Sequence, residues 1–319
     1  KILLSLIGRI NQRCPSFRAV LLNKICKILL RSLWGEDANV KKFRKRMSFL
    51  EFFFFGKVFG VSICNKKYKD VSAHIIKPRG CDSSKALLYF HGGGFVSHSP
   101  KVYQRFCSRL AKELKCVVIV PDYRLAPEHP FPAALEDCVT VYQEIVKKIT
   151  GANFRLCIAG DSAGGNLALA TMLKIKEIGL KHPCALWLVS PAVDCDWSKY
   201  DYSDLQKSDP MFTENAFPLM DAYFGDEDKS NYMISPLNGD LRNLPPILVE
   251  AGGDEIFRRH PILLENALKS CGGDVIVKIW PRMMHVFQLF TFLPEAKKSI
   301  SQACQFLENK MNPSETSKN

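Results

Sequence analysis

The chain has 319 residues, of which 47% are hydrophobic and 24% charged, and its formal net charge is +12. These values are ordinary for a globular protein and exclude collagen-like and disordered classes. Its twelve cysteines are scattered, without a CxxC pair or metal-finger spacing, so we expect reduced thiols, no metal or other cofactor, and a cytoplasmic location.

Residues 1–60 carry most of the net positive charge, with 13 Lys and Arg against 3 Asp and Glu. Apolar residues recur there at helical spacing with Lys and Arg between them, which predicts amphipathic helices. Their basic face is either solvated or in contact with anionic lipid. No nucleic-acid motif accompanies the charge, so we expect no nucleic-acid partner.

Residues 49–63 are very apolar and include Phe52, Phe53, Phe54 and Phe55. Glu51 and Lys57 interrupt this run, which is too short to span a bilayer, so we expect it to be buried or interfacial. No secretory signal is evident, although the sequence begins at Lys1 and an upstream segment could have been removed.

From about residue 70, short β-rich runs alternate with helical patterns, as a mostly parallel sheet covered by helices requires. The predicted strands are Val71–Ile76, Ala86–Phe90, Val117–Val120, Arg155–Ala159, Ala185–Val189, Ile247–Glu250 and Val275–Ile279. The predicted helices lie near 101–114, 132–148, 163–178, 259–270 and 294–310.

The alternation stops between Val189 and Ile247, and a gap of that length usually has a function. We expect an insertion that covers the carboxyl edge of the sheet together with the N-terminal helices. The predicted division is an N-terminal helical cap segment at 1–60, a catalytic core at 61–192, a cap insertion at 193–243 and the rest of the core at 244–319.

Two glycine-rich motifs follow predicted strands. Gly160–Gly164 is a GxSxG sequence between a strand and a helix, which predicts a sharp turn that exposes Ser162 as a nucleophile. His91–Gly94 follows another strand, and its glycines let backbone N–H groups come close to a developing oxyanion. We assign the oxyanion hole to the N–H groups of Gly93, Gly94 and Ala163.

A serine nucleophile needs a histidine base and an acid that orients it, in the chain order Ser, acid, His. His285 lies in the loop after the last predicted strand, whereas His182 and His260 are expected at the surface. Asp254, just after the strand Ile247–Glu250, is the predicted acid. Its rivals are Asp194 and Asp196, and we expect the adjacent Glu255 to point elsewhere.

With these motifs, the chain resembles the hormone-sensitive-lipase family, the bacterial family IV esterases. The resemblance rests on HGGGF (91–95), PDYRLAPEHPFPAALED (121–137), GDSAGGN (160–166), SDPMF (208–212), residues 252–254 and His285 with its two following residues. It implies an α/β-hydrolase fold with an eight-stranded core sheet, a cap, and ester hydrolysis without a cofactor. It also implies mainly structural roles for His91, Asp122, Arg124 and Glu128.

The sequence therefore predicts a serine carboxylesterase that acts on short- to medium-chain acyl esters through an acyl-enzyme. Phe212, Phe217 and Phe287, with Phe290, are candidates for an apolar substrate pocket, although ordinary packing of the cap explains them equally well. The alternatives are an amidase or deacetylase with the same triad, and a non-catalytic small-molecule receptor on a hydrolase scaffold. A homodimer and peripheral membrane contact through the basic N-terminus are further possibilities.

Overall fold

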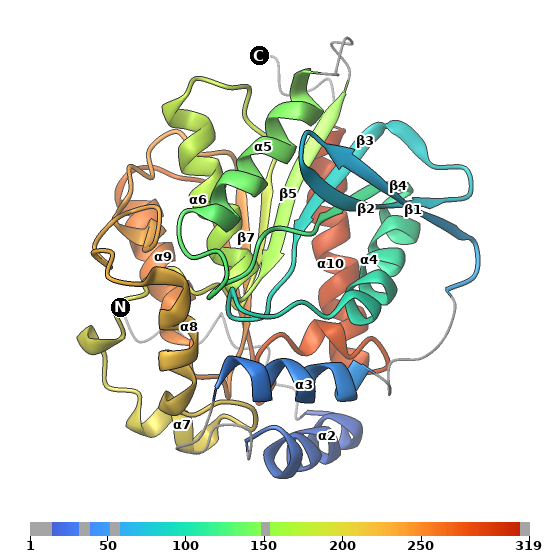
Figure 1. The fold of residues 1–319 in the computed structure, drawn as a ribbon. Helices are drawn as coiled ribbons and strands as arrows, with labels where there is room; N and C mark the ends of the chain where they lie inside the picture. The colour runs from blue at the N-terminus through green and yellow to red at the C-terminus, as the bar shows by residue number, and fades with distance from the viewer. Residues whose placement is uncertain (1–14, 32–38, 52–57, 148–153, 313–319) are drawn as a thin grey trace.

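An eight-stranded sheet forms the centre of the molecule in the computed structural model, which describes residues 15–31, 39–51, 58–147 and 154–312 (Figure 1). The strand order is β1-β2-β4-β3-β5-β6-β7-β8. β2 pairs antiparallel with β1 and β4, and the remaining pairs are parallel. The strands are β1 Val61–Tyr68, β2 Val71–Pro78, β3 Asp82–Phe90, β4 Cys116–Pro121, β5 Arg155–Asp161, β6 Leu186–Val189, β7 Ile247–Gly252 and β8 Val275–Trp280.

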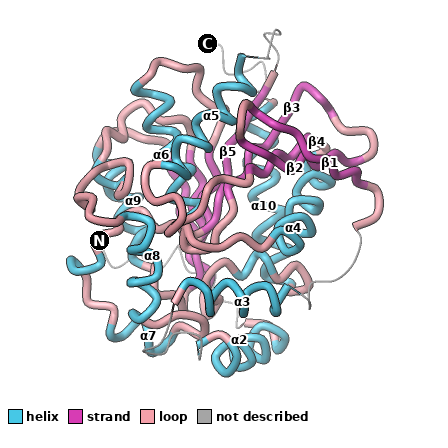
Figure 2. The backbone as a smooth tube through the Cα atoms, in the orientation of Figure 1, coloured by secondary structure: helices cyan, strands magenta, loops and turns pink. Residues whose placement is uncertain are grey.

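Helices cover both faces of this sheet, because successive residues of a strand point to opposite sides. In β3, Leu88 and Phe90 join one hydrophobic cluster, while Leu87 and Tyr89 join the other. The first cluster includes α5, α6 and α9, the second α4 and α10, so the strands lie between two helical layers (Figure 2). These helices are α4 Pro100–Leu114, α5 Ala133–Lys147, α6 Ala163–Glu177, α9 Arg259–Ser270 and α10 Pro294–Met311.

The predicted fold class is confirmed, and each strand and helix predicted from residue 70 onward is present within a few residues of its expected bounds. The strand β1 was not predicted from its own sequence. It is an edge strand with six exposed residues, and the adjacent Lys66 and Lys67 break the alternation of apolar and polar side chains that identifies a strand.

In the described part of the chain, four further α-helices lie at the end of the sheet where the parallel strands finish (Figure 1). Two precede the sheet in sequence and two belong to the long gap after β6. They are α2 Phe17–Leu29, α3 Val40–Glu51, α7 Ser203–Ser208 and α8 Phe217–Phe224. Among the described helices, none has the length and the apolar character that crossing a bilayer demands. Residues 1–14 and Phe52–Phe55, which figured in the sequence predictions, lie outside the described residues.

Candidate active site

Ser162 occupies a sharp turn between β5 and α6. Its backbone angles are φ 54° and ψ −118°, a strained conformation for a residue with a side chain. The turn is possible because its neighbours are small: a Cβ at Gly160 would clash with the carbonyl of Gly164, and one at Gly164 with the carbonyl of Phe90. This geometry is the nucleophile elbow that the GxSxG motif predicts.

The loop after β3 presents the glycines of the second motif beside this turn. Gly93 and Gly94 have φ values of 129° and 62°, in the region that favours glycine. The carbonyl oxygen of Gly93 accepts hydrogen bonds from Val96 N–H at 3.2 Å and Ser97 N–H at 3.0 Å, which closes the loop. Among the described residues, the N–H groups of Gly93, Gly94 and Ala163 have no acceptor, so they are available to a ligand.

A buried carboxylate forms a hydrogen bond with the first glycine of this loop. Asp161, immediately before Ser162, accepts hydrogen bonds from the hydroxyls of Tyr89 and Tyr103, both at 2.8 Å, and from Gly92 N–H at 3.1 Å. Burial raises the pKa of Asp161 to about 6. Because Asp161 ties Gly92 to β5, it fixes the oxyanion loop relative to the elbow.

Of the four residues expected to have structural roles, three lie in the oxyanion loop or contact residues that bind it, and Arg124 binds the start of α5. The His91 ring stacks between His98 and Tyr123, with centroid distances of 3.9 and 4.1 Å, and burial holds its pKa well below the usual value. Asp122 lies 3.2 Å from Nδ1 of His98, and two ion pairs are formed by the others, Arg124–Asp137 at 2.8 Å and Glu128–Arg44 at 2.7 Å.

His285 and a glutamate meet at the same edge of the sheet as Ser162. The Nδ1 atom of His285 lies 3.7 Å from Oε1 of Glu255, and the two side chains are 3% and 0% exposed. The other oxygen of Glu255 accepts from the Ser190 hydroxyl at 2.7 Å and from Gly252 N–H at 2.8 Å. Glu255 is therefore held with one oxygen free to face the imidazole.

Ser162, Glu255 and His285 follow β5, β7 and β8, which reach one edge of the sheet in parallel. The side chains of Ser162 and His285 are nearly buried there, and Nε2 of His285 has no hydrogen-bond partner among the described residues. Hydrogen bonds between catalytic groups are often longer without substrate and tighten when it binds.

The structure places a different carboxylate beside His285 from the predicted one. Among the described residues, the carboxylate within 4.0 Å of a His285 nitrogen is that of Glu255, whereas Asp254 turns toward Arg282, 4.0 Å away. Asp254 is partly exposed, and burial of the remainder raises its pKa. The turn through Gly252 and Gly253 rotates the chain so that the second acidic residue after it, and not the first, faces inward.

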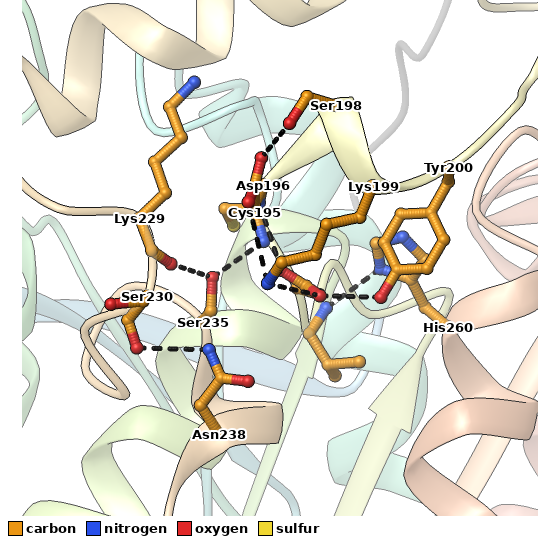
Figure 3. A network of polar contacts seen from close by, with 12 residues as sticks. Cys195, Asp196, Ser198, Lys199, Tyr200, Lys229, Ser230, Ser235, Asn238 and His260 are labelled. Atoms are coloured by element: carbon orange, nitrogen blue, oxygen red, sulfur yellow. Dashed lines mark hydrogen bonds and ion pairs between the residues drawn. The ribbon is translucent and has the colours of Figure 1, made fainter.

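The rival acids belong to a separate network at the start of the insertion, of which Figure 3 labels Asp196, Lys199 and Tyr200. Asp194 accepts from the Tyr200 hydroxyl at 2.6 Å and pairs with Lys199 at 3.3 Å, and Asp196 accepts from the Ser198 hydroxyl. His260, expected at the surface, is fully buried, because its Nδ1 accepts the N–H of Val193 at 3.1 Å. This network fastens the start of the insertion to α9.

The predicted substrate-binding phenylalanines separate into two groups. Phe212 lies edge-on to His285 with a centroid distance of 5.0 Å, so it borders the site. Phe217 stacks on Trp197 at 4.7 Å and is 7% exposed, and Phe287 packs against Trp280 with no exposed surface. These two belong to hydrophobic clusters, as ordinary packing of the cap predicts, and Phe290 joins the cluster of Phe287 as a partly buried member. A contact of Phe217 or Phe287 with substrate stays a prediction.

Contacts from both N-terminal helices reach the loops of the site. Arg44 of α3 donates to the carbonyls of Val96 and Ala126 at 2.6 and 2.8 Å. Asn23 of α2 donates to the carbonyl of Arg282 at 2.9 Å, three residues before His285. Sequence patterns gave the helices but not these contacts, which depend on how the helices dock.

A doubly covered, mostly parallel sheet with a nucleophile elbow, an oxyanion loop and a histidine after its last strand defines an α/β-hydrolase. The chain matches the alpha/beta hydrolase fold family over residues 87–289 and belongs to it. The resemblance to hormone-sensitive-lipase-like esterases is confirmed by known relatives, and the chain is a carboxylic-ester hydrolase.

Two curated relatives and one solved structure illustrate this similarity. An acetyl-hydrolase of Streptomyces hygroscopicus is 31% identical over 74% of this chain and 79% of its own length. Esterase LipU of Mycobacterium tuberculosis is 30% identical over 75% of this chain and 84% of its own. The crystal structure of a hormone-sensitive-lipase homologue from a metagenome library is 34% identical, with a TM-score of 0.84 over 94% of this chain and all of that one.

Proposed function

We propose that this chain hydrolyses short- to medium-chain acyl esters through a covalent acyl-enzyme on Ser162, with His285 as base and Glu255 as the acid that orients it. The observation that carries this proposal is the 3.7 Å separation between Glu255 and Nδ1 of His285 at the sheet edge where the elbow presents Ser162. A buried carboxylate at Nδ1 selects the tautomer whose Nε2 accepts a proton.

The reaction follows from the roles of these groups. His285 Nε2 takes the hydroxyl proton of Ser162 as its oxygen attacks the ester carbonyl. The N–H groups of Gly93, Gly94 and Ala163 hold the resulting oxyanion, and one such donor in another serine hydrolase is worth about 2.7–4 kcal/mol. His285 then protonates the departing alcohol, and water activated by the same imidazole releases the acid from Ser162.

The substrate class is inferred from the site and from relatives. Phe212 places an apolar ring beside the base, where it can contact an acyl or alcohol group. Relatives named acetyl-hydrolase and esterase support small esters. The cytoplasmic location remains a prediction from the scattered cysteines.

Replacement of Ser162 by Ala tests the nucleophile. We expect hydrolysis of p-nitrophenyl butyrate to disappear while the protein stays folded, because the variant loses a single hydroxyl. A serine-directed phosphonate should label the wild-type chain once, at Ser162, by peptide mass spectrometry. Turnover at the wild-type rate in Ser162→Ala, or labelling at another serine, contradicts the assignment.

A series of p-nitrophenyl esters from acetate to palmitate, with p-nitroanilides of the same acids, tests the substrate class. We expect the highest kcat/KM between acetate and octanoate, and anilide rates lower by several orders of magnitude. A preference for anilides would favour an amidase, and a maximum at palmitate would favour a long-chain lipase.

A further inference from the structure

The outer face of α2 is apolar, which is unusual for a helix on a protein surface. Phe17, Leu21, Ile25 and Ile28 are 81, 48, 43 and 73% exposed. Their spacing of four, four and three residues places them along one side of the helix. A surface helix ordinarily carries polar residues there, and contiguous exposed apolar surface indicates an interaction site.

The opposite side of α2 is fixed to the enzyme. Ala19 and Cys26, seven residues apart, are buried with Met283 and Met284, which directly precede His285. The start of the helix is tied down as well, because Ser16 donates from its backbone N–H and its hydroxyl to Glu295 at 2.6 and 3.0 Å. The apolar stripe therefore belongs to a helix whose inner side is already packed against the rest of the protein.

Cationic side chains border this stripe. Arg18, Lys24 and Lys27 are exposed, and none of them pairs with a carboxylate within the described part of the chain. α2 contains no acidic residue, and α3, at the same end of the molecule, adds the exposed Lys41 and Lys45 (Figure 1). An apolar stripe with basic flanks combines the two features that bind a helix to an anionic bilayer surface.

We propose that α2 is an interfacial helix that docks this esterase on anionic membranes. Phe17, Leu21, Ile25 and Ile28 enter the boundary between headgroups and acyl chains, while Arg18, Lys24 and Lys27 contact anionic headgroups. Because α2 packs on the segment that carries His285, docking brings the active-site end of the sheet to the lipid surface. Membrane binding itself does not depend on the proposed catalytic assignment.

Charge argues against a second copy of the chain as the occupant. A twofold dimer through α2 would place the basic flanks of the two helices close to each other, with no acidic residue on α2 to pair with them. An anionic bilayer complements both the apolar and the charged parts of the surface.

The test is flotation of the full chain, as the inactive Ser162→Ala form, with vesicles of phosphatidylcholine alone or with about 30% phosphatidylserine. We expect binding to the anionic vesicles that weakens as salt rises from about 0.05 to 0.5 M. Phe17→Gln/Ile28→Gln should lower the bound fraction by about tenfold or more, because two large apolar contacts are lost. Lys24→Gln/Lys27→Gln should reduce the preference for anionic vesicles.

Matched control variants distinguish binding through α2 from nonspecific adsorption of the protein to vesicles. Ile178→Gln/Ile262→Gln removes two exposed apolar side chains, one directly after α6 and one in α9, and Lys67→Gln/Lys69→Gln removes two exposed charges from the β1–β2 hairpin. We expect both to bind like the parent. Hydrolysis of soluble p-nitrophenyl butyrate, measured with Ser162 restored, should be unchanged in the four double variants.

Three results would overturn the proposal. They are failure of the parent to bind anionic vesicles, equal loss of binding in the control variants, and a dimer in gel filtration that Phe17→Gln/Ile28→Gln dissociates. Loss of esterase activity in Ser162→Ala leaves this result untouched, so the membrane proposal and the catalytic proposal fail separately.

Discussion

At the scale of single residues, the acid of the site shows what a sequence pattern can and cannot resolve. The order Ser, acid, His and the position after β7 lead to one segment, in which two acidic residues stand next to each other. Which of them faces His285 depends on the rotation of the chain through Gly252 and Gly253, and on the donors Ser190 and Gly252 that hold Glu255. Ser190 directly follows β6 and Gly252 ends β7, and no local sequence pattern predicts their contacts with Glu255.

Two adjacent substitutions test this assignment, Glu255→Gln and Asp254→Asn. Glu255→Gln should lower kcat by about four orders of magnitude, the loss known for the corresponding change in another triad enzyme, since the amide no longer selects the required imidazole tautomer. Asp254→Asn should lower kcat by less than about tenfold, because its carboxylate points toward Arg282. Initial rates on p-nitrophenyl butyrate measure both.

Ser190→Ala is the control for a purely structural effect of Glu255→Gln. Ser190 donates to Glu255 and accepts the N–H of Val286 at 3.2 Å, so its loss disturbs the packing of the acid without removing its charge. A small loss of kcat in Ser190→Ala beside a large one in Glu255→Gln supports the catalytic role. A greater loss in Asp254→Asn than in Glu255→Gln would restore Asp254 as the acid.

At the scale of elements, the buried parallel strands and the long helices were predictable because their hydrophobic periods are strong. The edge strand β1 was not, because only its last residue, Tyr68, is buried. The docking of α3 was also not predictable. Arg44 is one of five basic residues in Val40–Glu51, and the local sequence does not distinguish it from the other four. Only the fold places its guanidinium against Val96 and Ala126.

The contact of Arg44 leads to a prediction for α3. Arg44→Gln removes charge-assisted hydrogen bonds to two carbonyls beside the oxyanion loop, each worth about 1.5–3 kcal/mol in a buried setting and less at this half-exposed site. We expect kcat/KM to fall by about tenfold and the melting temperature to drop. Glu128→Gln breaks only the exposed ion pair and should change stability by about 0.5 kcal/mol or less. If Arg44→Gln and Glu128→Gln changed kcat/KM and melting temperature equally, the contribution of Arg44 would come from its ion pair with Glu128 alone.

At the scale of the whole molecule, the site lies at one end of the sheet and is held by buried carboxylates from two different parts of the chain. Asp161 links β5 to the oxyanion loop. Asp209, in the insertion, accepts the N–H groups of Met211, Phe212 and Ile256 at 2.6, 2.9 and 2.7 Å, and so joins the insertion to the loop that follows Glu255. Burial raises the pKa of each carboxyl to about 6. Asp161 and Asp209 both hold loops of the candidate active site in place. Because burial disfavours their ionised forms, each lowers the stability of the folded state at neutral pH.

This arrangement predicts how stability depends on pH. In the folded chain Asp161 titrates near pH 6, against an ordinary value of 3.8, so between these values the folded state binds more protons than the unfolded state. The contribution of Asp161 to stability is therefore complete below about pH 3.8 and is lost as pH rises through about 6. Relative to Asp161→Asn, which does not titrate, the wild type should be more stable at pH 5 than at pH 8 by about 1–2 kcal/mol. Urea unfolding of both proteins at the two pH values measures this difference, and a difference of zero or of opposite sign contradicts the raised pKa.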